Sequence, residues 1–192
     1  DIDGNTGFIA PGRVPVRKSG RGRQPVPGWT GAYDWTGFIP FDGLPQTHNP
    51  ASGRIVNANH RVVPRNYDWY LTDDWSPPYR ARRIHDLLDG PEPHTMQRSS
   101  NLQNDTVSLA ARDLVPVLLG LLSARTERKE AIAARLRSWD GKMSRNAAEP
   151  LIFMAWLAEL NRALYSDELG PQFSRYFRLR PRVVLHMLSN SP

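Results

Sequence analysis

The sequence predicts an α+β protein in which a strand-rich first part is followed by a helical second part. Residues 1–100 hold 12 Pro and 11 Gly, whereas residues 101–192 hold 5 Pro and 3 Gly. Apolar residues recur at helical spacing in the second part, where the chain breakers are sparse. With 192 residues in total, the chain suits one domain or slightly more. We therefore divide it into a strand region, residues 1–92, and a helical region, residues 93–192.

Short strands are expected in the first part. Residues 8–10 and 13–16 are the shorter candidates, and residues 37–41 and 54–59 are longer ones bounded by Gly and Pro. Extended segments of this length need partners, and unpaired edges favour association. We therefore expect self-association through exposed strand edges when neighbouring chain is missing.

Helices are expected from the apolar periodicity of the second part. The first covers residues 107–122, with cap oxygens from 104–106 and a bend at Pro116. A shorter amphipathic helix over residues 131–139 would stop at Asp140-Gly141.

A third helix is expected after a capping-box pattern, Asn146-x-x-Glu149, and runs to about Tyr165. Further helix is expected over residues 173–177 and 183–188. The helical region should therefore contain three to five helices packed against the strand region.

Several function classes are excluded by composition. No apolar stretch approaches the roughly 20 residues of a membrane span. The absence of cysteine excludes disulfides, thiolate metal sites and a Cys nucleophile. Common nucleotide, zinc-protease and serine-hydrolase motifs are also absent, and the five His residues are scattered without metal-ligand spacing. The sequence predicts no cofactor and no metal ligand in this chain.

The net charge of +6 is carried mainly by arginine. Its densest run is Arg17-Lys18-Ser19-Gly20-Arg21-Gly22-Arg23. A Gly-rich basic loop can grip phosphates, but this one lacks the interleaved aromatic residues that stack on bases. Nucleic-acid binding through this loop is therefore kept only as the weakest alternative.

Three stretches carry a more specific pattern. They are PVPGWTGAYDWTGFIPF at residues 25–41, NPASGRIVNAN at residues 49–59 and WSPPYRARRI at residues 75–84. In order and spacing they resemble the large catalytic subunit of the penicillin amidase family of N-terminal-nucleophile hydrolases, which includes penicillin and acyl-homoserine-lactone acylases. The resemblance continues more weakly through residues 86–88, 95–97, 114–116 and 139–141. It implies that the strands belong to an αββα sandwich and that the whole protein cleaves an acyl group from an amine.

The family resemblance also implies a mechanism. The first residue of the large subunit, a Ser, attacks the amide, and its own α-amine serves as the base, which is feasible because an α-amino pKa lies near 7.7–8.0. An Asn side chain then holds the tetrahedral oxyanion, and an Arg shortly after it orients the site. By motif position these catalytic roles fall on Asn59 and Arg80, with Asn57 as a competitor for the first role.

The resemblance further implies a structural calcium ion in the full enzyme. Asp68 lies near the point where one ligand would fall, but the spacing slips by a residue there. One carboxylate also falls far short of the six to eight oxygens that calcium takes. We therefore expect Asp68 to be a solvated side chain.

The chain departs from the family pattern at its start. It begins at Asp1, whereas the nucleophilic Ser of the family precedes the first matching stretch. We expect these 192 residues to be an internal piece of the large subunit that is inactive alone. Its partners would be the acyl amide substrate, the small subunit and the remaining large-subunit chain, in the periplasm by resemblance. The alternative is a binding or scaffold module that has lost the chemistry.

Overall fold

The computed structural model describes residues 1–91, 93–122, 126–176 and 180–189. The chain forms two compact units, residues 1–81 and 82–192. Helix α1, Tyr79–Leu88, spans the join between them. The division at residues 92 and 93 that the sequence suggests stays a prediction.

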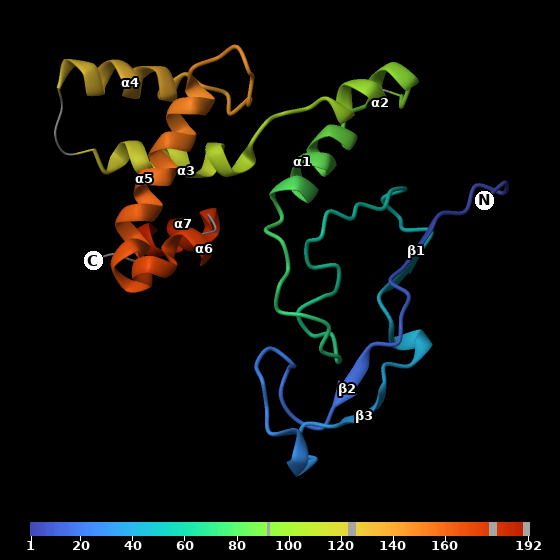
Figure 1. The fold of residues 1–192 in the computed structure, drawn as a ribbon. Helices are drawn as coiled ribbons and strands as arrows, with labels where there is room; N and C mark the ends of the chain where they lie inside the picture. The colour runs from blue at the N-terminus through green and yellow to red at the C-terminus, as the bar shows by residue number, and fades with distance from the viewer. Residues whose placement is uncertain (92, 123–125, 177–179, 190–192) are drawn as a thin grey trace. The chain divides into compact units, whose positions relative to one another are not determined.

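The first unit is built on two small antiparallel sheets (Figure 1). Strand β1, Gly7–Ile9, pairs with β4, Gln46–His48. Strand β2, Pro15–Arg17, pairs with β3, Trp35–Phe38, in a register that shifts between Val16 and Arg17. Short 3₁₀ turns, η1 at Gly28–Thr30 and η2 at Phe41–Gly43, lie in the connections. The rest of this unit is loop, as its Pro and Gly content predicts.

The strand predictions are confirmed in part. Predicted strands 8–10 and 13–16 overlap β1 and β2, and the segment 37–41 contributes only its first residues to β3. The prediction of a strand over residues 54–59 is wrong, because this segment makes no ladder and ends in a bend at Asn59. Strand β4 was not predicted, since Gln46, Thr47 and His48 are all polar and show no alternation.

The second unit is helical and contains further α-helices besides most of α1. In chain order they are α2 (Met96–Gln103), α3 (Leu109–Gly120), α4 (Glu127–Arg137), α5 (Glu149–Leu169), α6 (Phe173–Tyr176) and α7 (Pro181–Ser189), with the 3₁₀ turn η3 (Gly170–Gln172) before α6. In Figure 1, α5 runs at a steep angle to α3 and α4. Residue 177, the end of one predicted helix, lies outside the described residues.

The core of the second unit lies between α3, α4, α5 and α7. Its buried side chains are Ala111, Leu114, Val115, Leu118, Leu136, Phe153, Leu157 and Val184. Trp139 packs its ring against Phe153 with centroids 5.6 Å apart. Truncating a core leucine such as Leu114, which has no exposed surface, typically costs about 2–5 kcal/mol. The helical spacing of apolar residues therefore identified most of this core, but it also included Leu121, which is exposed, and not Val115, which is buried.

The helix starts differ from the predicted caps. Ser108 caps α3 by accepting a hydrogen bond from the Ala111 amide, so the predicted caps at 104–106 are wrong. The expected capping box before α5 is also wrong: Ala148 occupies the cap position without a side-chain bond, and Glu149 pairs with Arg135 instead. Short polar side chains fit several positions of a turn, so their spacing alone does not choose among them.

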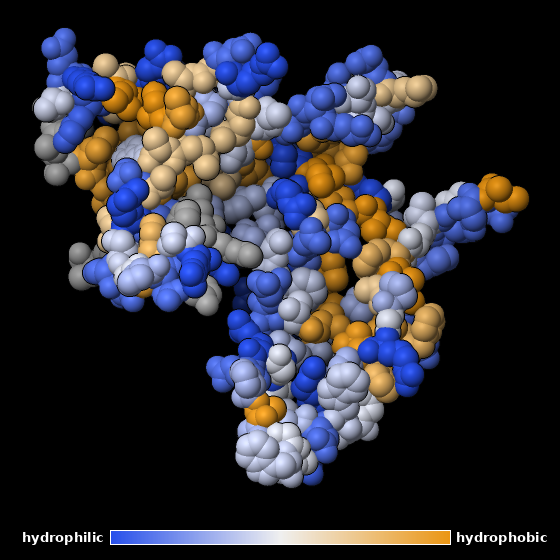
Figure 2. All heavy atoms as spheres, viewed as in Figure 1, coloured by the Kyte–Doolittle hydropathy of each residue, from blue (hydrophilic) through white to orange (hydrophobic). Residues whose placement is uncertain are grey.

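Apolar residues remain at the surface of both units, as the orange areas of Figure 2 show. They include Phe41 in the first unit and Leu151 in the second, which are 66% and 74% exposed. Among the residues described, no helix has the length and hydropathy needed to cross a membrane.

Candidate functional site

The predicted site residues meet at the neck of one long loop in the first unit. The amide of Ser76 donates to the Asn59 carbonyl at 2.9 Å, which closes the loop between residues 59 and 76. Pro77 and Pro78 end this loop, and α1 begins at Tyr79. The chain closure brings Arg80, in the first turn of α1, back to the start of the loop.

Asn59 lies in the left-handed region, with φ at 60°. Among residues other than Gly, Asn tolerates this conformation best because its short side chain can bond the local backbone. Here the local bond comes from the side chain of Asn57, whose Oδ1 accepts a hydrogen bond from the backbone amide of Asn59 at 3.1 Å. Asn57 and Asn59 therefore do not share a strand face, and Asn57 holds the turn on which Asn59 sits.

Arg80 fixes the orientation of the Asn59 amide group. Its Nη2 donates to the Ala58 carbonyl at 2.8 Å and to Asn59 Oδ1 at 2.9 Å. Because a guanidinium can only donate, the oxygen of the Asn59 amide must face Arg80 and the NH₂ group must face away. The Asn59 side chain is exposed, so both of its N–H groups can reach a ligand from solvent.

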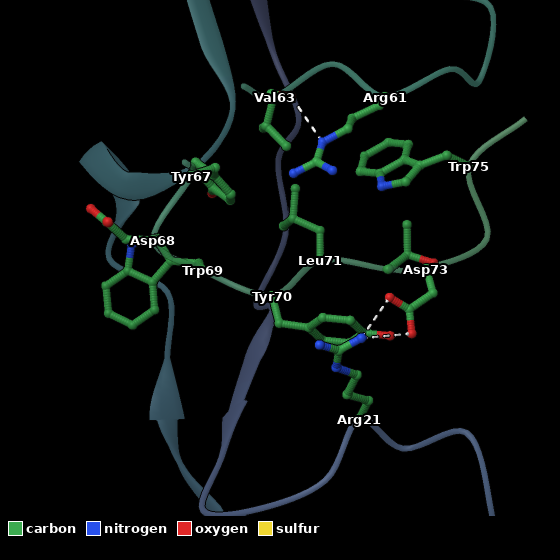
Figure 3. Close-up of a pocket in the computed structure, with 11 residues that line it drawn as sticks. Arg21, Arg61, Val63, Tyr67, Asp68, Trp69, Tyr70, Leu71, Asp73 and Trp75 are labelled. Atoms are coloured by element: carbon green, nitrogen blue, oxygen red, sulfur yellow. Dashed lines mark hydrogen bonds and ion pairs between the residues drawn. The ribbon is translucent and has the colours of Figure 1, made fainter. Parts of the chain in front are cut away.

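A cavity of about 480 Å³ lies along residues 61–75 of the same loop (Figure 3). Aromatic and charged side chains form most of its wall, with Trp75 and Arg61 at one end and Trp69 and Asp68 at the other. No local sequence pattern indicates this cavity, because its wall combines the loop with Arg21 from a distant segment. Only the density of aromatic residues between 67 and 75 could have suggested it.

Asp73 ties the basic loop to this wall. Its carboxylate accepts from Arg21 at 3.0 Å and from Arg23 at 3.1 Å. Partial burial opposes its ionisation, but the hydrogen bond and charge of Arg21, together with the charge of Arg23, hold the pKa of Asp73 below its usual range. Asp73 therefore pairs with two cations of the densest basic run and offsets one of their two charges, which weakens the case for nucleic-acid binding.

A calcium site is not formed by the side chains described. Asp68 is exposed, and no group of three or more His, Asp or Glu side chains is arranged to hold a metal in the described part of the chain. Calcium needs six to eight oxygen ligands, so these residues alone do not fit it. Calcium in the whole enzyme stays a prediction, and no chemical step below depends on it.

The chain resembles known proteins over most of its length. The family model for penicillin amidase matches residues 1–191. An acyl-homoserine lactone acylase, QuiP, of Pseudomonas aeruginosa is 34% identical over 179 residues, which cover 86% of this chain and 21% of the relative. Penicillin acylase 2 proenzyme of a Pseudomonas species is 34% identical over 170 residues, covering 84% and 21%.

A solved structure gives the same fold. Thermostable penicillin G acylase from Alcaligenes faecalis matches with a TM-score of 0.73 at 23% identity, covering 93% of this chain and 34% of that one. The chain thus spans about a fifth of the length of the curated relatives it matches. Sequence and fold agree over nearly all of its residues, and the chain belongs to the penicillin amidase family.

Proposed function

We propose that this chain supplies the oxyanion donor and its orienting arginine to an amide hydrolase that cleaves an acyl group from an amine. The acyl-enzyme would form on an N-terminal Ser in polypeptide outside these 192 residues. The observation that carries the proposal is the pair of hydrogen bonds from Arg80 to Ala58 and Asn59. They hold a donor group in one orientation before any substrate arrives, as oxyanion stabilisation requires.

The chemical roles follow from the donor sets. Attack by the Ser hydroxyl on the amide carbonyl forms a C–O bond and moves the carbonyl electron pair onto oxygen. The Asn59 Nδ2 group would donate to this oxyanion. Arg80 would not touch the substrate; it would keep the Asn59 oxygen turned away, so that no acceptor faces the negative charge. Collapse of the intermediate would expel the amine after it receives the proton taken from Ser.

The substrate class is proposed from the relatives, which are named as acyl-homoserine lactone and penicillin acylases. Both names describe an amide between an acyl group and an amine. We therefore propose an acyl amide as substrate. A periplasmic location and a structural calcium ion in the whole enzyme stay predictions.

The remaining polypeptide of the enzyme is the proposed partner. The chain exposes 14,243 Å², whereas two separate folded domains with its total mass would expose roughly 11,000 Å². The excess area supports cover by other chain, including the small subunit. Self-association through the edges of the two small sheets stays the prediction for the isolated chain.

The alternative is a scaffold module without chemistry, and kinetics on the full-length parent separate the two. Asn59→Ala should lower kcat for a phenylacetyl amide or an acyl-homoserine lactone about 10²–10³-fold and leave KM nearly unchanged. Asn59→Gly should lower kcat equally, because it removes the same donor while relieving the positive φ.

Asn49 provides the matched control. It also has a positive φ, 43°, but bonds Thr6 and Asn5 rather than Arg80. Asn49→Ala should therefore leave kcat unchanged. A loss confined to KM in Asn59→Ala, or full activity in Asn59→Gly, would rule out the oxyanion role. Turnover by the purified 192-residue chain alone would contradict the placement of the nucleophile.

A further inference from the structure

The cavity of about 480 Å³ lined by Arg21 and by residues between 61 and 75 includes neither Asn59 nor Arg80 in its wall. Its volume lies within the usual range for small-molecule pockets. We propose that this cavity binds a flat carboxylate, an aromatic acid, through Arg61 and the ring of Trp75. The proposal concerns residues 61–75 of the loop, whereas the proposed catalytic residues, Asn59 and Arg80, lie where the loop closes.

Arg61 has donors to spare. Its Nε donates to the Val63 carbonyl and its Nη2 to the Pro64 carbonyl, both at 3.1 Å. A guanidinium carries five N–H groups, so three remain after these two bonds. Across the described ranges, no carboxylate pairs with Arg61. The two backbone bonds hold the guanidinium in place, and a fixed planar fork suits a carboxylate.

Aromatic rings provide a flat wall beside this cation. Figure 3 shows the Trp75 ring next to the Arg61 guanidinium. Leu71 lies between Arg61 and Tyr70 in the same view. The Tyr70 ring is already covered on one face by Arg21, whose guanidinium carbon lies 5.2 Å from the ring centroid. The ring of a bound ligand would therefore contact Trp75 and Leu71, and the carboxylate of the ligand would point to Arg61.

The charges that face the cavity also favour an anion at the Arg61 end. They are Arg21, Arg61, Asp68 and Asp73. Asp73 is occupied by Arg21 and Arg23. Asp68 lies at the opposite end, beside Trp69 and away from Arg61 (Figure 3). Attraction by Arg61 is therefore opposed only by distant or already paired carboxylates.

Three probes separate the parts of this proposal when titrated into the 192-residue chain. They are 2-naphthoate, which has the rings and the charge, 2-naphthamide, which has the rings alone, and acetate, which has the charge alone. Binding is followed by NMR on the indole N–H signal of Trp75, identified with Trp75→Phe. We expect naphthoate to shift this signal saturably, with a Kd at least about tenfold below those of naphthamide and acetate.

Substitutions then test the named side chain. Arg61→Gln should raise the naphthoate Kd about tenfold and abolish the preference over naphthamide. Arg65→Gln is the matched control, since Arg65 is exposed on the same loop but does not line the cavity; it should leave the Kd within about twofold. Equal affinity for acid and amide, or equal effects of the two substitutions, would overturn the proposal.

Arg61→Gln could also disturb the loop, because Arg61 bonds two backbone carbonyls. The naphthamide Kd of this variant reports whether the cavity persists. If naphthamide binding is lost too, Arg61→Lys decides: a retained preference for the acid supports the proposal, and a lost preference overturns it. The measurement is of binding, so it is independent of whether Asn59 acts in hydrolysis.

Discussion

The side-chain oxygen of Asn59 accepts a hydrogen bond of 2.9 Å from Nη2 of Arg80, across a loop of about twenty residues. The same nitrogen also bonds the Ala58 carbonyl at 2.8 Å. One guanidinium thus fixes both the backbone that carries Asn59 and the rotation of its amide. The donor face of Asn59 is set by Arg80, which gives the arginine a positioning role that does not require contact with substrate.

Substitution of Arg80 should lower kcat in graded steps in the full-length parent. Arg80→Lys keeps a cationic donor nitrogen on a shorter side chain, so it restores the two bonds only in part and should lower kcat about tenfold, whereas Arg80→Gln should lower it about a hundredfold. KM should change less than kcat in both variants, because the lost interaction orients a group used in the transition state. Steady-state kinetics with one acyl amide substrate measure both quantities.

Arg82 is the control for this series. It lies two residues further along α1 and is more than half exposed, and its one ion pair among the described residues is a long contact of 3.6 Å with Asp113. Surface pairs of this kind contribute little, so Arg82→Gln should leave kcat and stability unchanged. An Arg80→Lys variant no better than Arg80→Gln would contradict an orienting role for this cationic donor.

The sequence allowed the candidate residues to be named but not their geometry. Asn59 and Arg80 were identified through a family resemblance, and their contact follows from a closed loop that no local pattern encodes. The turn at Asn59 replaces the expected strand because the side-chain oxygen of Asn57 accepts a hydrogen bond from the backbone amide of Asn59. Such local competition by Asn side chains depends on the chain around it and is not visible in residue spacing.

The helical unit was more predictable than the strand region for a physical reason. Leu114, Leu118 and Leu157 follow helical periodicity because each helix buries one face, and this signal extends over several turns. The strands are only three or four residues long, so two or three side chains carry the whole signal. Helix α1 was missed because its sequence YRARRIHDLL is strongly charged and buries only Ala81 completely.

Asp105 should make the stability of the second unit depend on pH. Arg83 bonds both of its oxygens, at 2.9 and 2.7 Å, and this bonding holds the pKa of Asp105 below its usual range although partial burial acts in the opposite direction. A depressed folded-state pKa adds stability that is complete above the unfolded-state value of about 3.9 and is lost as the pH falls through the folded value.

Asp105→Asn should therefore lower the free energy of unfolding by about 2 kcal/mol at pH 7, since the two side chains are only 22% and 17% exposed. The difference from the wild type should shrink below pH ~4. Urea unfolding followed by far-UV circular dichroism across this range measures it. A difference that stays constant down to the acid limit would mean that the ion pair does not contribute.

Gly141 should be intolerant of any side chain. Its φ is +80°, and a Cβ there would lie 3.1 Å from the Ser108 carbonyl oxygen and 3.0 Å from Cγ of Arg112. The Ser108 amide also donates to the Gly141 carbonyl at 2.8 Å, so the backbone cannot move away freely. Gly141→Ala should lower the free energy of unfolding by about 2–3 kcal/mol.

Gly53 separates the two causes of that loss. Its φ is +67°, but nothing lies within 4 Å of a Cβ built there. Gly53→Ala should therefore cost only the backbone penalty of about 1 kcal/mol. If both variants lost the same stability in urea unfolding, the close approach of Ser108 and Arg112 would have no energetic weight.

Asn161 should be replaceable by leucine with a gain in stability. It is fully buried in α5, where its Nδ2 donates to the Leu157 carbonyl of the preceding turn at 2.7 Å. Its Oδ1 is buried and has no hydrogen-bond partner in the described part of the chain. A buried acceptor without a partner costs about 1–3 kcal/mol, and leucine fills a similar volume without that cost.

Asn161→Leu should therefore raise the free energy of unfolding by about 1 kcal/mol, whereas Asn161→Ala should lower it because it leaves a cavity. Thermal unfolding of the isolated chain and of the whole enzyme measures both effects. If leucine destabilised the whole enzyme but not the isolated chain, other polypeptide would have to donate to Asn161 in the assembled protein.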